Sequence, residues 1–478
     1  ASEEPIPPTP EIVSDVVEDV PQAPDDITEE TAVEADVTPE VVEPEFTYTY
    51  HRDVKPIFET LCVNCHQPGA IRASSPLTTY EESLPWLDAI QHQVATRKMP
   101  PWPGDPTCAD YKHKEYLTPD EIERVVTWVD EGAPEGDPDA EPNPMHDILF
   151  ANLSREDLVI SMPLEYTPQT SPDDYRCFLI PWPLEETTYI TGFGARPGNT
   201  DVVHHAIAFL IEPSVLPKFQ AWDEADPGPG YSCFGGPSGP GAENSIQNGT
   251  WFLSAWTPGS PGADSPVGTG MKVEPGSYIS LQIHYNTYFS DPEPDLTEVM
   301  FKLDDTVENP GWAQPWTNPD WIDGNPFAGL PPMTIPAGES DAVFSFVKDP
   351  WTLPPFLSPF PGKKLVLLYH AALHMHYLGT SGRVFIERAD GTETCLLSIA
   401  EYDFDWQRIY PFQDGIELRP GDKLGVECHF DNSAENQPLV DGVPKEPVDV
   451  TWGEGSTNEM CWAVMYLVAL DEDPAATD

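Results

Sequence analysis

Basic residues and long apolar runs are scarce in this sequence of 478 residues. Only 23 Lys and Arg stand against 81 Asp and Glu, which gives a formal net charge of −58. Because such a chain repels phosphate backbones, we expect no nucleic-acid partner. No apolar run approaches the ~18 residues of a membrane-spanning helix, so we expect no membrane span. Position 1 is Ala and no basic segment precedes an apolar one, so we expect that an export signal has already been removed.

Proline and glycine, by contrast, are abundant. The 57 prolines and 33 glycines are spread along the whole chain, which disfavours long helices and favours short strands joined by turns. At a usual size of roughly 100 to 200 residues per domain, the length predicts about two to four domains. The sequence therefore predicts a multi-domain protein whose bulk is all-β.

Changes in composition divide the chain. Residues 1–47 are acidic, rich in proline and without Lys or Arg, which predicts a disordered tail. Residues 48–136 have helical patterns and predict a small all-α domain. Residues 137–145 are proline-rich and predict a linker. From there on, short apolar or alternating runs bounded by Pro, Gly and Asp predict two all-β jelly-roll (β-sandwich) domains, 146–298 and 299–478.

Two amphipathic helices are predicted in the small domain. One begins at Thr118, which can cap the helix while Glu121 reaches back to the Thr118 amide, and Gly132 offers its end. Its apolar stripe is Ile122, Val125, Val126 and Val129. The other helix is predicted over residues 84–97, and its inner face would be Leu84, Leu87, Ala89, Ile90 and Val94.

A Cys-x-x-Cys-His motif occupies positions 62 to 66. Cys62 and Cys65 have the spacing for two thioether bonds to the vinyl groups of a haem, and His66 can then be an axial iron ligand. Met99, 33 residues later in a proline-rich turn, can supply the sixth ligand. The motif alone also fits a redox disulfide or half of a zinc site. The helical surroundings and the downstream Met favour one covalent haem c in a class I cytochrome c domain.

Other residues near the motif have two interpretations each. His92 and His113 are rival axial ligands, but both are expected on a solvated helix face or loop. Trp86 and Trp102 are candidates for the walls of the haem pocket and fit equally well as core aromatics. Haem is attached in this way outside the bacterial cytoplasm, so we expect a periplasmic or secreted protein in which the other six cysteines pair as disulfides. Their spacing does not select among the 15 pairings that six cysteines allow.

Histidine is scarce, yet five of the 12 fall on three predicted strands of the β region. His374 and His376 are two apart, so on a regular strand they point the same way and can hold one metal ion. His204 and His205 are neighbours, so joint ligation requires a bulge or a strand end. His284 lies in a third strand pattern. Each alone is more often a structural histidine than a ligand, but together they favour metal binding.

These residues resemble the copper type II, ascorbate-dependent monooxygenases, a family that includes peptidylglycine- and dopamine-hydroxylating enzymes. The resemblance covers about residues 150–475 and keeps the order of the family's motifs. The motifs are Val203-His204-His205-Ala206, Ser277-Tyr278, Gln282-Ile283-His284-Tyr285, His374-Met375-His376-Tyr377-Leu378-Gly379 and Gly455-Ser456-Thr457-Asn458-Glu459-Met460-Cys461. The resemblance implies two copper ions: an electron-transfer copper held by His204, His205 and His284, and an oxygen-binding copper held by His374, His376 and Met460.

The chemistry of these donors agrees with copper. Imidazole suits both copper oxidation states and a thioether favours Cu(I), although a single Met such as Met460 is more often a core filler. His370 shares strand parity with His374 and is either a further ligand or a structural residue. The resemblance also implies two disulfides, Cys177–Cys233 and Cys428–Cys461. It leaves Cys108 and Cys395, which either join the haem and copper domains or stay apart.

The fusion predicts a monooxygenase that hydroxylates a C–H bond of an organic substrate with O2. Its electrons would pass from a periplasmic or extracellular donor through the haem to the copper ions. Peptide-hydroxylating members hold a substrate carboxylate with Arg, Asn and Tyr, whereas the corresponding places here carry Ala372, Trp462 and Val464. This disfavours a peptide substrate and favours an apolar or aromatic one. The alternatives are a non-catalytic electron carrier or copper-handling protein and, less well supported because of Met99, a haem peroxidase.

Overall fold

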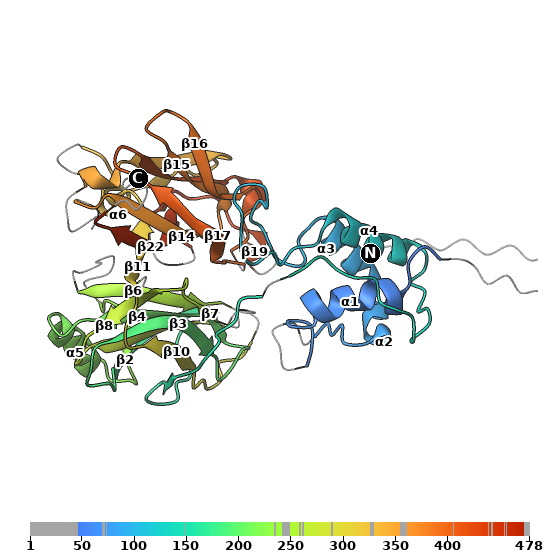
Figure 1. Ribbon diagram of the computed structural model, residues 1–478, viewed down its shortest axis with the longest axis horizontal. Helices are drawn as coiled ribbons and strands as arrows, with labels where there is room; N and C mark the ends of the chain where they lie inside the picture. The colour runs from blue at the N-terminus through green and yellow to red at the C-terminus, as the bar shows by residue number, and fades with distance from the viewer. Residues whose placement is uncertain are drawn as a thin grey trace, which may run out of the picture. The chain divides into compact units, whose positions relative to one another are not determined.

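The structure is a computed structural model of the whole chain (Figure 1). It describes residues 46–472 apart from 69–71, 73, 149, 234–235, 241–248, 258–259, 261, 288–289, 326–328, 354–359, 361, 405, 438, 441–442, 454 and 456. The acidic tail predicted over 1–47 lies outside these residues except for Phe46 and Thr47. In the described part of the chain, no helix has both the length and the apolar character needed to cross a membrane.

All the secondary-structure elements described between residues 46 and 136 are helical. The elements are η1 (Tyr50–Val54), α1 (Lys55–Ile57), η2 (Phe58–Cys62), α2 (Tyr80–Ser83), η3 (Leu84–Trp86), α3 (Leu87–Ala95) and α4 (Pro119–Asp130). They enclose one apolar core, in which Phe58, Val125 and Trp128 are fully buried. This segment therefore has a hydrophobic core of its own.

The predicted start and end of α4 are confirmed. The Thr118 hydroxyl accepts the amide of Glu121 at 3.3 Å, and the Glu121 carboxylate accepts the amide of Thr118 at 2.8 Å. This reciprocal pair is a capping box. Gly132, with φ of +86°, follows the last turn, as expected for a residue that ends a helix in the left-handed region.

The helix predicted over 84–97 is shorter than expected. Only α3 is α-helical, and η3 precedes it as a turn of 3₁₀ helix. Pro85 lacks an amide hydrogen, so this turn cannot make the full α-helical ladder. Ile90 and Val94 are buried as predicted, whereas Leu84 and Ala89 are exposed. The prediction was wrong for Leu84, which lies in the tighter turn outside α3, and for Ala89, which lies on α3 but on its exposed side.

Residues 98–117, between α3 and α4, extend to the C-terminal β region. Trp102 and Tyr111 are buried in the core of that region, not in the helical core. A disulfide joins Cys108 to Cys395 on strand β16 (Glu393–Ile399). The pairing of these two cysteines, left open by the sequence, thus links the helical segment to the β region. The two disulfides implied by the resemblance, Cys177–Cys233 and Cys428–Cys461, are also present.

The first part of the β region is a sandwich. One layer is a described sheet of five strands in the order β5-β2-β9-β4-β6, and strands β1, β10, β3 and β8 face it across an apolar core. The strands are β1 (Leu158–Ser161), β2 (Asp173–Pro181), β3 (Thr188–Arg196), β4 (Val203–Ile211), β5 (Tyr231–Ser232), β6 (Thr250–Trp256), β7 (Ala263–Asp264), β8 (Thr269–Val273), β9 (Tyr278–Asn286) and β10 (Glu298–Asp304), and helix α5 (Leu216–Ala225) follows β4.

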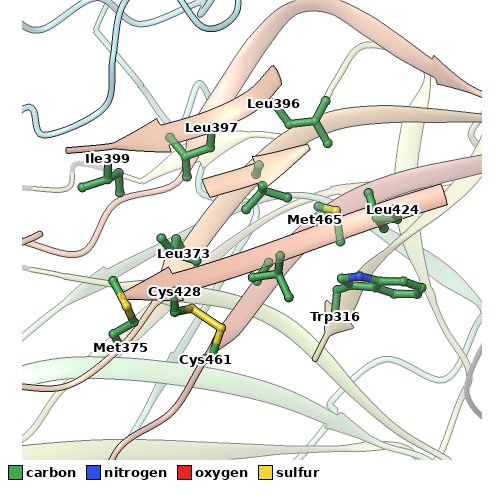
Figure 2. Close-up of a cluster of buried hydrophobic side chains, with 14 of the residues drawn as sticks. Trp316, Leu373, Met375, Leu396, Leu397, Ile399, Leu424, Cys428, Cys461 and Met465 are labelled. Atoms are coloured by element: carbon green, nitrogen blue, oxygen red, sulfur yellow. A yellow bond between two sulfur atoms is a disulfide. The ribbon is translucent and has the colours of Figure 1, made fainter. Parts of the chain in front are cut away.

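The second part is also a sandwich. A described sheet in the order β13-β18-β15-β16 faces strands β11, β22, β14 and β17. The main strands are β11 (Asn309–Trp316), β13 (Ala342–Lys348), β14 (Leu365–His374), β15 (Gly379–Glu387), β17 (Tyr410–Leu418), β18 (Lys423–Phe430) and β22 (Trp462–Leu470). The shorter elements are α6 (Pro319–Asp323), β12 (Thr334–Ile335), η4 (Pro350–Thr352), η5 (Ala434–Asn436), β19 (Leu439–Val440), β20 (Val443–Pro444) and β21 (Val450–Thr451). Figure 2 shows the Cys428–Cys461 disulfide inside this core, close to Met375.

One sheet runs through both sandwiches. Its order among the described strands is β1-β10-β3-β8-β11-β22-β14-β17, and the short parallel pairing of β8 with β11 connects the two parts. The boundary expected at 298/299 falls inside β10, which pairs with β1 and β3. Val299 and Phe301 of β10 are buried in the core of the first sandwich. The first sandwich therefore includes β10, since its apolar face is completed by this strand.

Candidate metal centres

Three imidazoles converge from two neighbouring strands of the first sandwich. His204 and His205 lie on β4 and His284 lies on β9. The Nδ1 atom of His204 is 3.2 Å from that of His205 and 3.2 Å from that of His284, and the third pair is 3.4 Å apart. The β4–β9 ladder shifts register between Val203 and His205. This is the irregularity that two adjacent side chains need in order to face one point.

A carboxylate fixes the orientation of one of these rings. The Nε2 atom of His284 is 2.8 Å from Oδ1 of Asp173, and the side-chain amide of Asn286 donates to the same oxygen at 3.0 Å. The Tyr175 ring stacks on His284 with centroids 4.1 Å apart. Because an ionised carboxylate can only accept, the proton of His284 lies on Nε2, and the lone pair on Nδ1 faces the other two histidines.

Two further imidazoles converge in the second sandwich. The Nε2 atoms of His374 and His376 are 3.2 Å apart. Nδ1 of His374 donates to Oε1 of Gln407, and Nδ1 of His376 donates to the carbonyl oxygen of Asn458 at 3.0 Å. Since both partners are carbonyl oxygens, both Nδ1 atoms carry the protons and both Nε2 lone pairs face each other.

The sequence predicted His376 on a regular strand. In the structure it lies just beyond the end of β14. The Tyr402 hydroxyl accepts the amide of Met375 at 3.0 Å and donates to its carbonyl at 2.7 Å. The Glu459 carboxylate accepts the amides of His376 at 2.8 Å and Leu378 at 2.6 Å. These two side chains replace the strand partners of the backbone, so the chain leaves the sheet between the two histidines.

Glu459 is fully buried. Burial raises the pKa of its carboxyl to about 8, although three backbone amides, from His376, Leu378 and Met460, act in the opposite direction. A buried carboxyl that organises backbone amides is costly to ionise. The sequence places Glu459 in a motif but gives no sign of this structural role.

Met460 follows Glu459 directly and is only 2% exposed. It packs within the apolar core of the second sandwich, and the next residue, Cys461, is bonded to Cys428 on β18. It also lies two positions after Asn458, whose carbonyl oxygen holds His376. The structure thus anchors the chain on both sides of Met460. The role of Met460 as a third ligand stays a prediction.

Burial lowers the pKa of all five histidines. The pKa falls to about 3 for His204 and for His376, and it lies well below its usual value for His205. It is also lowered for His284 and His374, whose hydrogen bonds to Asp173 and Gln407 oppose the effect of burial. The rings are therefore neutral near pH 7, the state that metal ligation requires.

The separations of the nitrogens fit a metal ion. Imidazole nitrogens bind first-row metals at about 2.0–2.1 Å, which places two of them about 3.3 Å apart on a tetrahedral ion. The observed separations are 3.2 to 3.4 Å in the first centre and 3.2 Å in the second. The three residues of the first centre lie close enough together to hold one metal ion. Imidazole donors fit copper in either oxidation state.

The residues of the predicted haem site are only partly brought together. Cys62 and Cys65 are free thiols in the described part of the chain. Nδ1 of His66 is 2.8 Å from the carbonyl oxygen of Ser75, so it donates there and leaves Nε2 available. Met99 lines a cavity of about 450 Å³, and the motif residues are not among the described residues that line this cavity.

The residues with two interpretations are placed as follows. His92 is exposed on α3, as expected, and His113 is half-buried. Trp86 is 37% exposed, and Trp102 packs against Tyr410 with ring centroids 5.2 Å apart. Trp102 is thus part of the core of the second sandwich and also lines the cavity that Met99 lines, so both interpretations stay open for it. His370 on β14 packs against the ring of Tyr466 at 5.6 Å.

Residues 359–473, which include His374, His376 and Met460, match the family model described as "Copper type II ascorbate-dependent monooxygenase, C-terminal domain". This match supports that family. The chain is also 26% identical over 290 residues to peptidyl-glycine alpha-amidating monooxygenase A of Xenopus laevis, which covers 59% of this chain. The chain spans only 26% of the length of this relative. Together the two findings support a copper-dependent monooxygenase, an oxidoreductase.

Two solved structures show weak likeness. The VP2 subviral particle of infectious bursal disease virus is 11% identical, with 67% of this chain and 75% of that chain covered and a TM-score of 0.16. The PBSX exported protein XepA is 9% identical, with 68% and 89% covered and a TM-score of 0.14. TM-scores this low carry no argument about the fold or the function.

Sequence reasoning missed several residues of the two centres. Asp173 lies 111 positions from His284, and Gln407 lies 33 positions from His374. No local spacing connects such partners, since strand pairing and loop packing bring them together. A third residue, Phe404, contacts His204 of the first centre and His376 of the second.

Proposed function

We propose that this chain is a copper monooxygenase that hydroxylates a C–H bond of an organic substrate with O2 and receives its electrons through a covalently bound haem c. The observation that carries the proposal is the convergence of two separate sets of neutral imidazole nitrogens, at 3.2 to 3.4 Å and at 3.2 Å. The reaction balances as substrate C–H, O2, two electrons and two protons giving an alcohol and water. A periplasmic or extracellular reductant supplies both electrons.

The residues have distinct roles in this proposal. His204, His205 and His284 hold an electron-transfer copper, and His374, His376 and Met460 hold the copper at which O2 reacts. Copper supplies the one-electron steps that O2 reduction and C–H cleavage need. The chain itself fixes which nitrogen of each ring is available and keeps two of the second set of ligands away from bulk water, since Met460 and His376 are at most 3% exposed, whereas His374 is half-buried.

Two observations agree with a haem. The six other cysteines form three disulfides, whereas Cys62 and Cys65 remain free for thioether bonds. His66 is held by Ser75 with Nε2 available as an axial ligand. The three disulfides also support an oxidising compartment, in which covalent haem is formed.

The surroundings of the second centre support an apolar or aromatic substrate. Trp462 lies opposite His374 in the β14–β22 ladder, and Val464 lies opposite Ala372. These positions supply no charged group for a substrate carboxylate.

Metal analysis combined with isotopic oxygen tests the proposal. The purified protein should bind two copper ions per chain, show the spectrum of haem c, and transfer one atom of labelled O2 into an apolar or aromatic substrate. His374→Ala should abolish the transfer while leaving the haem spectrum unchanged. Two bound copper ions without any transfer of label over a broad substrate set would instead identify an electron carrier.

A further inference from the structure

The loop between β16 and β17 contacts both histidine centres through one ring. Phe404 is 8% exposed. Its ring stacks on that of His204, with centroids 5.5 Å apart and planes at 15°, and lies edge-on to His376 at 5.9 Å and 86°. A ligand of the first centre therefore lies on one side of the phenyl ring, and a ligand of the second centre lies on another.

Several contacts hold this ring in place. The Tyr377 ring packs on Phe404 with centroids 4.4 Å apart. The side-chain amide of Gln407 donates to the carbonyl oxygen of Phe404 at 3.0 Å, while its Oε1 accepts from His374. The backbone carbonyl of Gln407 accepts the hydroxyl of Thr257, in the loop after β6, at 3.2 Å. The loop is thus tied to both sandwiches and directly to a candidate ligand.

The same loop borders the cavity that Met99 lines. Its residues there are Ala400, Glu401, Tyr402, Asp403 and Trp406. Tyr402 also bonds both backbone groups of Met375, the residue between His374 and His376. Residues 400–408, of which Asp405 is not described, therefore border the cavity and also contact both centres.

We propose that Phe404 is the positioning residue that sets the separation of the two copper centres and provides the contact through which an electron passes between them. The inference rests on the proposed function and adds to it a specific route. With copper bound, one electron would pass from Cu(I) held by His204, His205 and His284 to Cu(II) held by His374, His376 and Met460, so that the first ion would be oxidised and the second reduced; no proton would move and no bond would be made or broken. The chain itself supplies the contact: the Phe404 ring touches His204 on one side and His376 on another.

Replacing the ring tests the inference. Phe404→Leu removes the aromatic contact and keeps an apolar side chain, whereas Phe404→Tyr keeps the ring. The matched control is Phe252→Leu, on β6, where the same change removes a ring that packs on Phe209. Each protein is loaded with two copper ions, and the dipolar coupling of the two Cu(II) centres is measured by electron paramagnetic resonance. The rate of electron transfer between centres is then followed after rapid reduction by one electron.

We expect Phe404→Leu, whose smaller side chain no longer holds the two centres at the same separation, to change the dipolar coupling and to slow the transfer while still binding two copper ions. Phe404→Tyr and Phe252→Leu should behave as the unmodified protein does. Unchanged coupling and rate in Phe404→Leu would overturn the inference and leave the proposed function intact, whereas failure of the unmodified protein to bind two copper ions would overturn both. If Phe404→Leu loses copper, the same measurement on Phe404→Trp tests the inference instead. The larger ring should weaken the dipolar coupling of the two Cu(II) centres, and unchanged coupling would overturn the inference.

Discussion

Glu459 makes the stability of the second sandwich depend on pH in a predictable direction. Its carboxyl is fully buried and its pKa is raised from 4.5 to about 8. A group whose pKa is higher in the folded state stabilises that state below its unfolded pKa, and this stabilisation is lost as the pH rises through the folded pKa. For Glu459 the loss extends over the window from pH 4.5 to about 8.

Comparison with Glu459→Gln separates Glu459 from the buried histidines. The pKa values of the histidines are lowered below 6.5 in the folded chain, so wherever they are still protonated in the unfolded chain, which includes the range just above pH 6.5, their titration raises the unfolding free energy with pH, and it does so in both proteins. One pKa unit corresponds to about 1.4 kcal/mol, so between pH 6.5 and 8 the unfolding free energy of the unmodified protein should fall, relative to that of Glu459→Gln, by roughly 1.5 to 2 kcal/mol. Glu459→Gln removes the titrating group and should remove this contribution to the slope.

The assay is urea unfolding of the metal-free protein at several pH values between 6.5 and 8. Glu459→Gln is compared with Glu435→Gln, in which an exposed glutamate of η5 is changed. Glu459→Gln lowers stability at every pH because an amide cannot accept all three backbone N–H groups, but only the slope reports the titration. Equal slopes in the unmodified protein and in Glu459→Gln would show that the buried carboxyl does not titrate here.

Three further predictions concern single contacts. Met460→Leu conserves volume and should cost less than about 1.5 kcal/mol in stability, yet it should lower the copper count from two to one in the reduced protein; two retained ions would exclude a thioether ligand. Asp173→Ala should weaken copper binding at the first centre about 10- to 100-fold by releasing the ring of His284, as measured by competitive titration, with binding at the second centre unchanged. Replacing both Cys108 and Cys395 by Ser should lower the unfolding free energy by about 3 to 5 kcal/mol, measured in urea against the unmodified protein with its disulfides intact, and no change would show that the bridge does not constrain the unfolded chain.

Features encoded by short stretches of sequence were predicted well. Thr118 and Glu121 lie three positions apart, so their capping box depends on one helical turn alone. The need for a bulge at His204 and His205 follows from strand alternation, and the register shift is found there. In both cases the decisive geometry lies within a few residues.

Features that depend on tertiary packing were not predicted. Trp102 and Tyr111 have the aromatic character of a core residue, but nothing in the sequence shows that their core is the second sandwich and not the helical one. The departure of His376 from the strand depends on Glu459 and Tyr402, which are 83 and about 27 positions from the backbone groups they hold. Because these partners meet only after the sheets form, local periodicity could not reveal them.

The two centres use opposite nitrogens of the imidazole ring, and this difference decides what holds each of them together. In the first centre the lone pairs are on Nδ1, the nitrogen nearer the backbone, so His204 and His205 reach one point only because the backbone itself is irregular there. In the second centre the lone pairs are on Nε2, and each Nδ1 is anchored by a carbonyl oxygen, of Gln407 or Asn458. The first centre is therefore set mainly by strand register, whereas the second is set by loops. Movement of the loop that carries Phe404 and Gln407 would thus change the second centre and its distance from the first while leaving the three-histidine centre intact.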